Sequence, residues 1–340
     1  MKTENRNVCR TEIKNKSNKN FCIEILISKK DLAGMNIAEE LKKQNIPFHL
    51  LEKETIYEDN IDTEIFGNKL QNLESNKNFC PKKSQNKPQT LVHDTQRFFD
   101  KKINADFFTQ KFSSKKISGP KNSNTDNQNF YVFATEHCSE KPSKTLTIHA
   151  PGNWRKAELG GKDNEIAPTS TLFLKQLFKI LNEENEKYKS EGKSEFQVSL
   201  EATHHGPTIN KPCCFIEIGS GKEEWQDKNA ARIIANTLSR ILKEKIPNAT
   251  PALAIGGPHY CPNFNKLQLN SKYAIGHIIA QYALPLTQEI LTEAINKTQE
   301  KIEIVILDWK GCGKSEERQK LIELLEKNNL SVIRTDQIEK

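Results

Sequence analysis

Residues 196–208, with the sequence FQVSLEATHHGPT, join an expected strand to an expected loop. The first five residues alternate between apolar and polar side chains, which is typical of a half-buried strand. Two adjacent histidines, His204 and His205, follow Glu201 and precede a Gly-Pro turn. Reactive groups in α/β proteins often stand where a strand ends in a loop, and imidazole suits both proton transfer and metal binding. A single loop histidine is commonly structural, but this pair beside Glu201 favours a functional site.

The rest of the chain repeats an order of strands and helices around this stretch. Apolar patterns predict strands at 21–28, 130–135, 144–149, 196–201, 213–218, 252–256 and 302–307. They predict helices at 34–43, 168–188, 224–244, 271–282, 286–298 and 315–328. Because strands alternate with helices, we expect an α/β fold of three layers, with a mainly parallel sheet and helices on both faces.

Two segments interrupt this order, residues 67–90 and 113–129. Both are rich in Asn, Lys, Ser, Gln and Pro and poor in aliphatic residues, so we expect mobile surface insertions. Residues 1–20 share this composition and are expected to be disordered. The remainder divides into an N-terminal α/β part, 21–160, which contains both insertions, and a C-terminal α/β part, 161–340, which carries most of the site.

Composition limits the class of protein without naming its substrate. The 340 residues carry a net charge of +7 and have a mean hydropathy of -0.70. No apolar run reaches the roughly 20 residues that a membrane helix needs, so we expect no membrane association. The eight cysteines include no Cys-x-x-Cys pair and offer no disulfide framework, which favours a reducing cytoplasm. The charge is compatible with a polyanionic partner but is too small to identify one.

Histidines gather at the ends of the predicted strands. Four of the eight histidines stand at or just after such ends: His149, His204, His205 and His259. Because the carboxyl ends of parallel strands share one edge of a sheet, these four should line one cleft. His277 falls within a predicted helix. The other three are expected to be structural or surface residues: His49, His93 and His137.

A histidine cluster with Glu201 and Glu217 nearby supports two kinds of hydrolysis. In one, a bound Zn²⁺ lowers the pKa of its water to about 7 and polarises a carbonyl group. In the other, a histidine acts as the general base, and glycine N–H groups hold the oxyanion. The spacing favours neither, because the chain contains no His-Glu-x-x-His or similar pair of ligands.

Two glycine-containing loops also follow predicted strands. Residues 219–222 (GSGK) suit anion binding at a helix N-terminus, and equally an ordinary strand-to-helix turn. Trp225, on the next helical turn, suits either stacking on a base or simple packing. Residues 311–315 (GCGKS) resemble a P-loop, but Asp308 stands where that motif requires glycine. Residues 316–340 alone follow, which is too little chain for an NTPase core, so this motif is rejected.

Five motifs together resemble one family. They are SKKDLAGMNIA (28–38), TIHAPGNW (147–154), LEATHHGPT (200–208), FIEIGS (215–220) and AIGGPHY (254–260). Over 21–50 and 130–330 the chain resembles the archaeal and plant type of D-aminoacyl-tRNA deacylase, with the motifs in that family's order. The two insertions match nothing in the family.

The resemblance implies hydrolysis of the ester between a D-amino acid and the 3′ end of a tRNA, which proofreads chirality. It also implies a zinc-dependent monomer with a fold similar to peptidyl-tRNA hydrolase. The expected catalytic residues are His149, Glu201, His204, His205 and His259. The expected substrate contacts are Gly206, Gly219, Lys222, Gly256, Gly257 and Tyr260. The family does not say which histidines hold the Zn²⁺, and we expect His204, His205 and His259.

Two other classes of function remain open at this point. One is a metal-dependent hydrolase or phosphorylase of small molecules on a similar sheet, which would turn over a free peptide or nucleoside and leave charged tRNA intact. The other is a non-catalytic tRNA-binding module, whose RNA binding would survive replacement of His204 and His205. A serine esterase is disfavoured, because the chain contains no Gly-x-Ser-x-Gly elbow.

We expect residues 67–90 and 113–129 to be dispensable, because segments of this composition bury too little apolar area to offset chain entropy. Replacing either segment by a short Gly/Ser linker should leave the free energy of unfolding and the deacylation rate nearly unchanged. Denaturant unfolding and an assay on charged tRNA test this. Insoluble or inactive protein would show that the replaced segment packs or binds.

Overall fold

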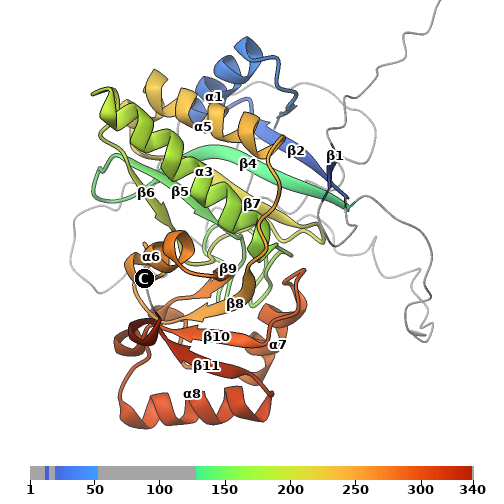
Figure 1. The fold of residues 1–340 in the computed structure, drawn as a ribbon, viewed down its shortest axis with the longest axis vertical. Helices are drawn as coiled ribbons and strands as arrows, with labels where there is room; N and C mark the ends of the chain where they lie inside the picture. Colours follow the sequence, from blue (N-terminus) through green and yellow to red (C-terminus); the bar gives the residue numbers. More distant parts are fainter. Residues whose placement is uncertain (1–11, 15–19, 53–127, 339–340) are drawn as a thin grey trace, which may run out of the picture. The chain divides into compact units, whose positions relative to one another are not determined.

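A computed structural model describes residues 12–14, 20–52 and 128–338 of the chain. Their strands form two sheets (Figure 1). The seven-stranded sheet contains β1 (Glu12–Lys14), β2 (Asn20–Ser28), β3 (His49–Leu51), β4 (Gln128–Cys138), β5 (Thr145–His149), β6 (Gln197–Leu200) and β7 (Cys213–Ser220). The four-stranded sheet contains β8 (Thr250–Ile255), β9 (Tyr273–Ile279), β10 (Ile304–Leu307) and β11 (Ser331–Arg334).

The described helices lie between these strands along the chain, although no helix separates β4 from β5 or β6 from β7. They are α1 (Leu32–Lys43), α3 (Thr171–Ser190), α4 (Lys222–Trp225), α5 (Lys228–Ile241), α6 (Pro262–Asn270), α7 (Gln288–Asn296) and α8 (Ser315–Lys327). Short 3-10 turns are η2 (Gln281–Ala283), η3 (Trp309–Gly311) and η4 (Thr335–Gln337). The predicted α/β class, with mainly parallel sheets flanked by helices, is confirmed. The strands divide between two sheets, and the likeness to peptidyl-tRNA hydrolase stays a prediction.

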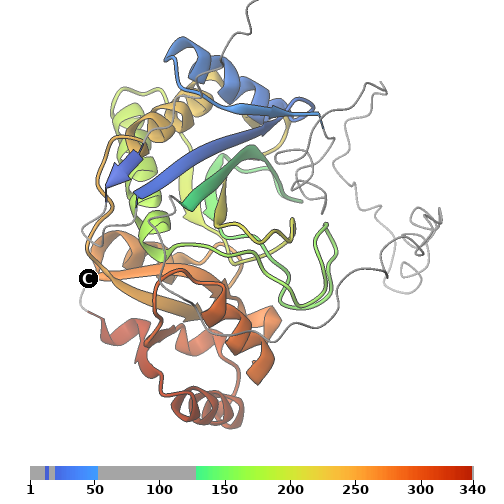
Figure 2. The same cartoon turned by 90° about the vertical axis from the view of Figure 1, so that its right-hand side faces the viewer.

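The seven-stranded sheet has the order β1-β2-β4-β7-β5-β6, with β3 also paired to β2. Strands β2, β4 and β7 run parallel, whereas β5 runs antiparallel to β7 and parallel to β6. Helices α1, α3 and α5 cover one face, as both views show (Figure 2). The other face packs on Ala167 and Ile209 from loops.

The four-stranded sheet is entirely parallel, in the order β11-β10-β8-β9. Apolar residues of α7 and α8 cover one face, and those of α3 and α6 cover the other. Helix α3 therefore packs against both sheets. Helix α3 packs so closely on β9 that a Cβ on Gly276 would stand 2.9 Å from Thr171 Cγ2. All four carboxyl ends lie at one edge, which places the loop after β8 beside the loop after β10.

The predicted helix at 271–282 is wrong, because residues 273–279 form the strand β9. All seven of its residues are buried, so the sequence shows neither the alternation of a half-buried strand nor a polar helix face. His277 consequently lies in a strand. The sequence also missed α6 and the short strands β3 and β11, and the predicted helix at 224–244 is the pair α4 and α5.

The low-complexity segments fall mostly outside the described residues. Residues 67–90 lie wholly outside, and 113–129 overlaps the described chain only at Gln128 and Asn129, which begin β4. Within residues 1–20, Glu12–Lys14 form β1, which pairs antiparallel with β2, and the expected disorder of the N-terminus stays a prediction. The proposed division of the chain at residue 160 stays a prediction. No helix among the described residues is long and apolar enough to cross a membrane.

The outer edge of β9 is paired with a side chain at Ile275. The Gln268 amide donates to Ile275 O (2.9 Å) and accepts from Ile275 N (2.8 Å), and Gln268 itself is fully buried. One side chain of α6 thus supplies the two hydrogen bonds that a neighbouring strand would make. Without it, two buried backbone groups would have no partner at this position.

We expect Gln268→Leu to lower the free energy of unfolding by about 2 to 4 kcal/mol, because it leaves a buried N–H and a buried C=O unsatisfied. Gln319→Leu is the control, since Gln319 is exposed in α8 and bonds Glu323 one turn away. The control should change stability by less than about 0.5 kcal/mol. Urea unfolding measures both, and equal effects of the two variants would contradict the role given to Gln268.

Candidate active site

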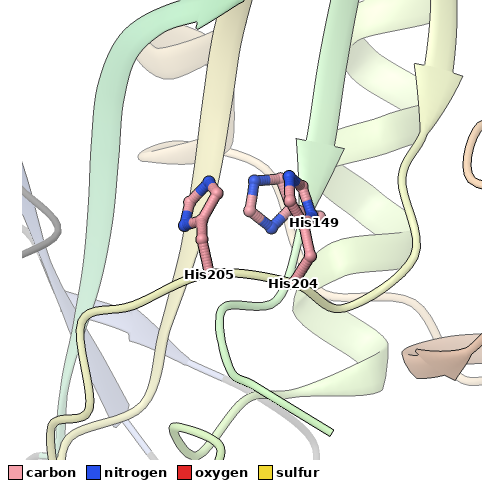
Figure 3. Close-up of side chains that lie close together, drawn as sticks. All are labelled: His149, His204 and His205. Carbon is pink, nitrogen blue, oxygen red and sulfur yellow. The ribbon is translucent and has the colours of Figure 1, made fainter. Parts of the chain in front are cut away.

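Four histidines converge as the sequence predicted, but they come from two sheets and not from one edge of a single parallel sheet. The ring centroid of His204 lies 4.2 Å from that of His149, 4.3 Å from that of His205 and 4.5 Å from that of His259. His149 ends β5, the pair at 204 and 205 lies in the loop after β6, and His259 follows β8. Figure 3 shows the rings of His149, His204 and His205 together at the end of β5.

The loop after β6 is fixed by backbone hydrogen bonds on two sides. Gly152 N donates to His204 O (3.2 Å) and His205 O (2.6 Å), which ties this loop to the loop after β5. Gly152 has φ 147°, and a Cβ there would stand 2.3 Å from Ile166, so glycine is required. On the other side, Thr203 N donates to Ile278 O (3.0 Å), and Ile278 N donates to Thr203 Oγ1 (3.1 Å). Strand β9 thereby holds the residue that precedes His204.

Three of the imidazoles are oriented by backbone carbonyls. Nδ1 of His149 lies 3.2 Å from Ala150 O, and Nδ1 of His204 lies 2.8 Å from Ala202 O. Nδ1 of His205 lies 2.6 Å from Gly206 O. A carbonyl oxygen only accepts, so each Nδ1 carries the proton and each Nε2 presents a lone pair. One ligand atom from each of these residues lies within 4.8 Å of the other two. This is the orientation that protein metal sites give to histidine ligands.

The electrostatic surroundings of these rings differ. Burial and the neighbouring imidazoles lower the pKa of His204 well below its usual range, and burial lowers the pKa of His205 to about 4. Both rings are therefore neutral near pH 7. Burial also acts to lower the pKa of His149, but Glu217 outweighs it and raises that pKa. Glu217 thus favours a positive charge at His149, which a proton or a metal ion can supply.

Glu201 is the buried anion of the site. Its side chain is fully buried, and neither carboxylate oxygen has a hydrogen-bond partner among the described residues. Imidazole nitrogens surround it instead: His137 Nδ1 at 3.3 Å, His204 Nε2 at 3.5 Å and His259 Nε2 at 3.6 Å. Burial acts to raise the pKa of Glu201, but the charge of His137 and the contact with His259 lower it. An ionised carboxylate in this setting requires a cation beside it.

Glu217 is a second buried carboxylate, in the middle of β7. Thr135 Oγ1 donates to it at 3.4 Å and Thr147 Oγ1 donates at 3.2 Å, from the strands on either side. The antiparallel register pairs Phe215 with His149, and the parallel register pairs Gly219 with His137. Because residues two apart share a face of a sheet, Glu217 lies between these two histidines on one face. Their nitrogens lie 3.7 Å (His149) and 3.4 Å (His137) from its oxygens.

The expectation that His137 is a structural or surface residue is wrong in its second part. His137 is buried within the site, and Nε2 lies 2.9 Å from Tyr260 Oη. Burial acts to lower its pKa, but Glu201 and Glu217 raise it to about 10, so the ring is charged near pH 7. The sequence missed it because the predicted strand ended at residue 135, whereas β4 continues to Cys138. His49 lies outside this group and contacts Glu24, and His93 is outside the described residues.

The glycines expected to contact substrate act mainly through packing in this structure. A Cβ on Gly219 would stand 2.5 Å from His137 Cδ2, so this glycine makes room for the imidazole. Gly256 and Gly257 have positive φ and allow the turn before His259 to approach Asp308. Gly206 is buried, and its N–H donates to Leu159 O (3.0 Å). Their expected contacts with substrate stay predictions.

The turn at Lys222 offers less than the sequence suggested. Helix α4 is only four residues long, and Glu223 and Glu224 stand beside the exposed Lys222. Trp225 is buried, and its Nε1 donates to His137 O (2.9 Å), so it packs and cannot stack on a base. The expected phosphate contact of Lys222 stays a prediction.

Three overlapping groups of side chains have the geometry for a metal ion. They are His149/His204/His205, Glu201/His204/His259 and His137/Glu201/Glu217. The expected ligands His204, His205 and His259 therefore divide between two groups. His204 belongs to both, while His205 is grouped with His149 and His259 with Glu201. The orphaned oxygens of Glu201 and the unpartnered Nε2 of His149, as judged within the described ranges, fit a bound cation.

Known proteins match the chain over these same residues. A family model described as D-aminoacyl-tRNA deacylase matches residues 124–333. The D-aminoacyl-tRNA deacylase of Pyrococcus furiosus is 39% identical over 204 residues, which cover 60% of this chain and 72% of that protein. The corresponding protein of Methanococcus maripaludis is 37% identical over 209 residues, covering 59% and 80%.

A crystal structure of a conserved protein of unknown function has a similar fold. It matches with a TM-score of 0.68 and 23% sequence identity, and covers 94% of this chain and 97% of that one. At that identity the likeness concerns the fold alone. The family model, in contrast, spans all the histidines and carboxylates of the cluster. The chain therefore belongs to the D-aminoacyl-tRNA deacylase family and is a hydrolase of the aminoacyl-tRNA ester.

Proposed function

We propose that the histidine and glutamate cluster is the catalytic centre at which this chain hydrolyses D-aminoacyl-tRNA with the help of zinc. The products would be free D-amino acid and tRNA, so the reaction proofreads chirality. The observation that carries this proposal is the carboxylate of Glu201, which is buried, lacks a hydrogen bond within the described chain and is surrounded by imidazoles. Such a carboxylate is suited to hold a cation or a transferred proton.

The donor set suits Zn²⁺. His149, His204 and His205 would hold the ion through Nε2, because each Nδ1 proton is engaged by a backbone carbonyl. When bound, zinc supplies Lewis-acid polarisation of the ester carbonyl. An aminoacyl ester is already activated, so a positioned water and one general base suffice without a covalent nucleophile. The absence of a serine elbow from the sequence agrees with this chemistry.

His259 is the best candidate for the general base. It is half-buried, and its Nδ1 lies 3.2 Å from Tyr282 Oη while its Nε2 lies 3.6 Å from Glu201. A proton taken from the attacking water at Nε2 would face the Glu201 carboxylate, which stabilises the imidazolium. The charged His137 offsets part of the negative charge of the two carboxylates, so both remain ionised.

We expect His149→Ala and His204→Ala each to reduce bound zinc and to slow deacylation of D-tyrosyl-tRNA by about 10²-fold or more, the usual scale for a lost ligand or base. The matched control is His49→Ala, because His49 lies at the exposed edge strand β3 and contacts Glu24. Its rate should stay within threefold of the parent. Elemental analysis of the purified proteins, paired with the tRNA assay, measures both quantities.

Several results would contradict that assignment. Full zinc content and near-parental rates in both variants would remove the metal from these histidines. Turnover of a free peptide or nucleoside, with none of charged tRNA, would favour a small-molecule hydrolase. Unchanged RNA binding in both variants, with no hydrolysis by the parent, would favour a binding module.

Glu201→Gln is expected to slow the reaction by roughly 10²-fold or more while the protein stays folded, because the amide keeps the shape but removes the charge that faces His259. Glu165→Gln removes a half-exposed carboxylate that contacts Lys162, and should leave the rate unchanged. Single-turnover assays on D- and L-tyrosyl-tRNA measure the rate of each variant on both substrates. A Glu201→Gln protein as active as the control would show that the negative charge is not used.

A further inference from the structure

Tyr282 stands at the exposed side of the histidine cluster. It lies in η2, just after β9, and its hydroxyl is 3.2 Å from His259 Nδ1. The two ring centroids are 6.3 Å apart, with planes at 30°. His259 in turn reaches the buried Glu201 at 3.6 Å. Tyr282 is thus separated from the buried carboxylate by one imidazole.

The ring of Tyr282 is exposed to an extent that packing does not require. The residue is 57% exposed, the highest value among the large hydrophobic residues that the described ranges leave exposed. Leu159 is also exposed, at 52%, and its carbonyl accepts from the N–H of Gly206 beside His205. Single exposed apolar side chains are ordinary, but Tyr282 also contacts His259 of the cluster through its hydroxyl.

The backbone that carries Tyr282 is firmly held. Gln281 N donates to Gly257 O (3.0 Å), and Ala283 N donates to Ala280 O (2.9 Å). The guanidinium of Arg155 donates to Ala283 O through Nε (3.2 Å) and Nη2 (2.9 Å). With its hydroxyl also engaged by His259, the ring is ordered before any ligand arrives. A ligand that stacks on it would therefore lose little side-chain entropy.

We propose that Tyr282 is the platform on which the unpaired base at the 3′ end of the RNA substrate stacks. The proposal rests on the proposed function and assigns a residue to the nucleotide end of that substrate. Proteins hold unpaired bases on exposed aromatic faces, and the ester to be cleaved is joined to the ribose of that terminal nucleotide. A base platform must therefore lie beside the reacting groups, as Tyr282 does. Trp225 is excluded from this role by its burial.

The first test uses uncharged tRNA and needs no catalysis. The parent protein should bind intact tRNA more tightly than tRNA that lacks its 3′-terminal adenosine, by roughly 5- to 150-fold for one stacked base. Tyr282→Ala should abolish this difference, whereas Tyr282→Phe should retain it because the ring remains. Leu269→Ala, which trims another exposed apolar residue (36%), is the control and should retain it too.

The second test separates the ring from the hydroxyl during turnover. With D-tyrosyl-tRNA, Tyr282→Ala should raise KM by at least about fivefold, and Tyr282→Phe should leave KM near that of the parent. Hydrolysis of a simple alkyl ester of D-tyrosine, which has no base, should lose no extra activity in Tyr282→Ala relative to Tyr282→Phe. Equal KM values for the two variants, with equal losses of kcat, would assign Tyr282 to holding His259 and would overturn the stacking role.

The two proposals fail in different ways. If the parent does not distinguish the two forms of uncharged tRNA, base stacking is overturned, whatever the hydrolytic activity. If the parent distinguishes them through Tyr282 but does not hydrolyse D-aminoacyl-tRNA, the platform stands and the proposed reaction is wrong.

Discussion

A buried, ionised carboxylate persists only where positive charge surrounds it, and Glu201 imposes this condition on the site. The charge comes from His137 at the end of β4, and the imidazoles of His204 after β6 and His259 after β8 complete the surroundings of Glu201. These segments belong to two sheets, so the arrangement exists only when both sheets and the loops between them are in place. The contact with the charged His137 allows Glu201 to be both buried and ionised.

The antiparallel pairing of β5 with β7 places His149 where it contacts Glu217, the second carboxylate of the site. Had β5 run parallel to β7, His149 would have stood at the same end of the sheet as His137. The reversal instead brings His149 beside Phe215, two residues before Glu217, while His137 lies beside Gly219, two residues after it. Glu217 can then contact both imidazoles and both threonine hydroxyls on a single face. The geometry is a property of strand order and not of any local motif.

This distinction explains what could be predicted from the sequence. His149, His204, His205 and His259 were brought together by a local rule, because each stands at or after the end of a strand. His137 was missed because its role depends on a register between strands that are distant in the sequence. The pattern of residues 271–282 predicts a helix in place of β9, because both faces of this strand are buried. The burial of Trp225 likewise depends on packing against residues that are distant in the sequence. The sequence alone could not show which histidines would hold zinc together, because this depends on the relative directions of their rings in the folded chain.

The outer edge of β9 has a further consequence for the behaviour of the chain in a crowded cell. An unpaired edge strand offers its N–H and C=O groups to any other extended chain, and this is a common route to aggregation. Here those groups are occupied at Ile275 by the Gln268 amide and at Ile278 by Thr203, the residue before His204. The loop that carries the histidines therefore also occupies part of the hydrogen-bonding edge of β9. Variants that loosen this loop would expose the edge of β9 as they displace the histidines, so they would become prone to self-association as they lose activity.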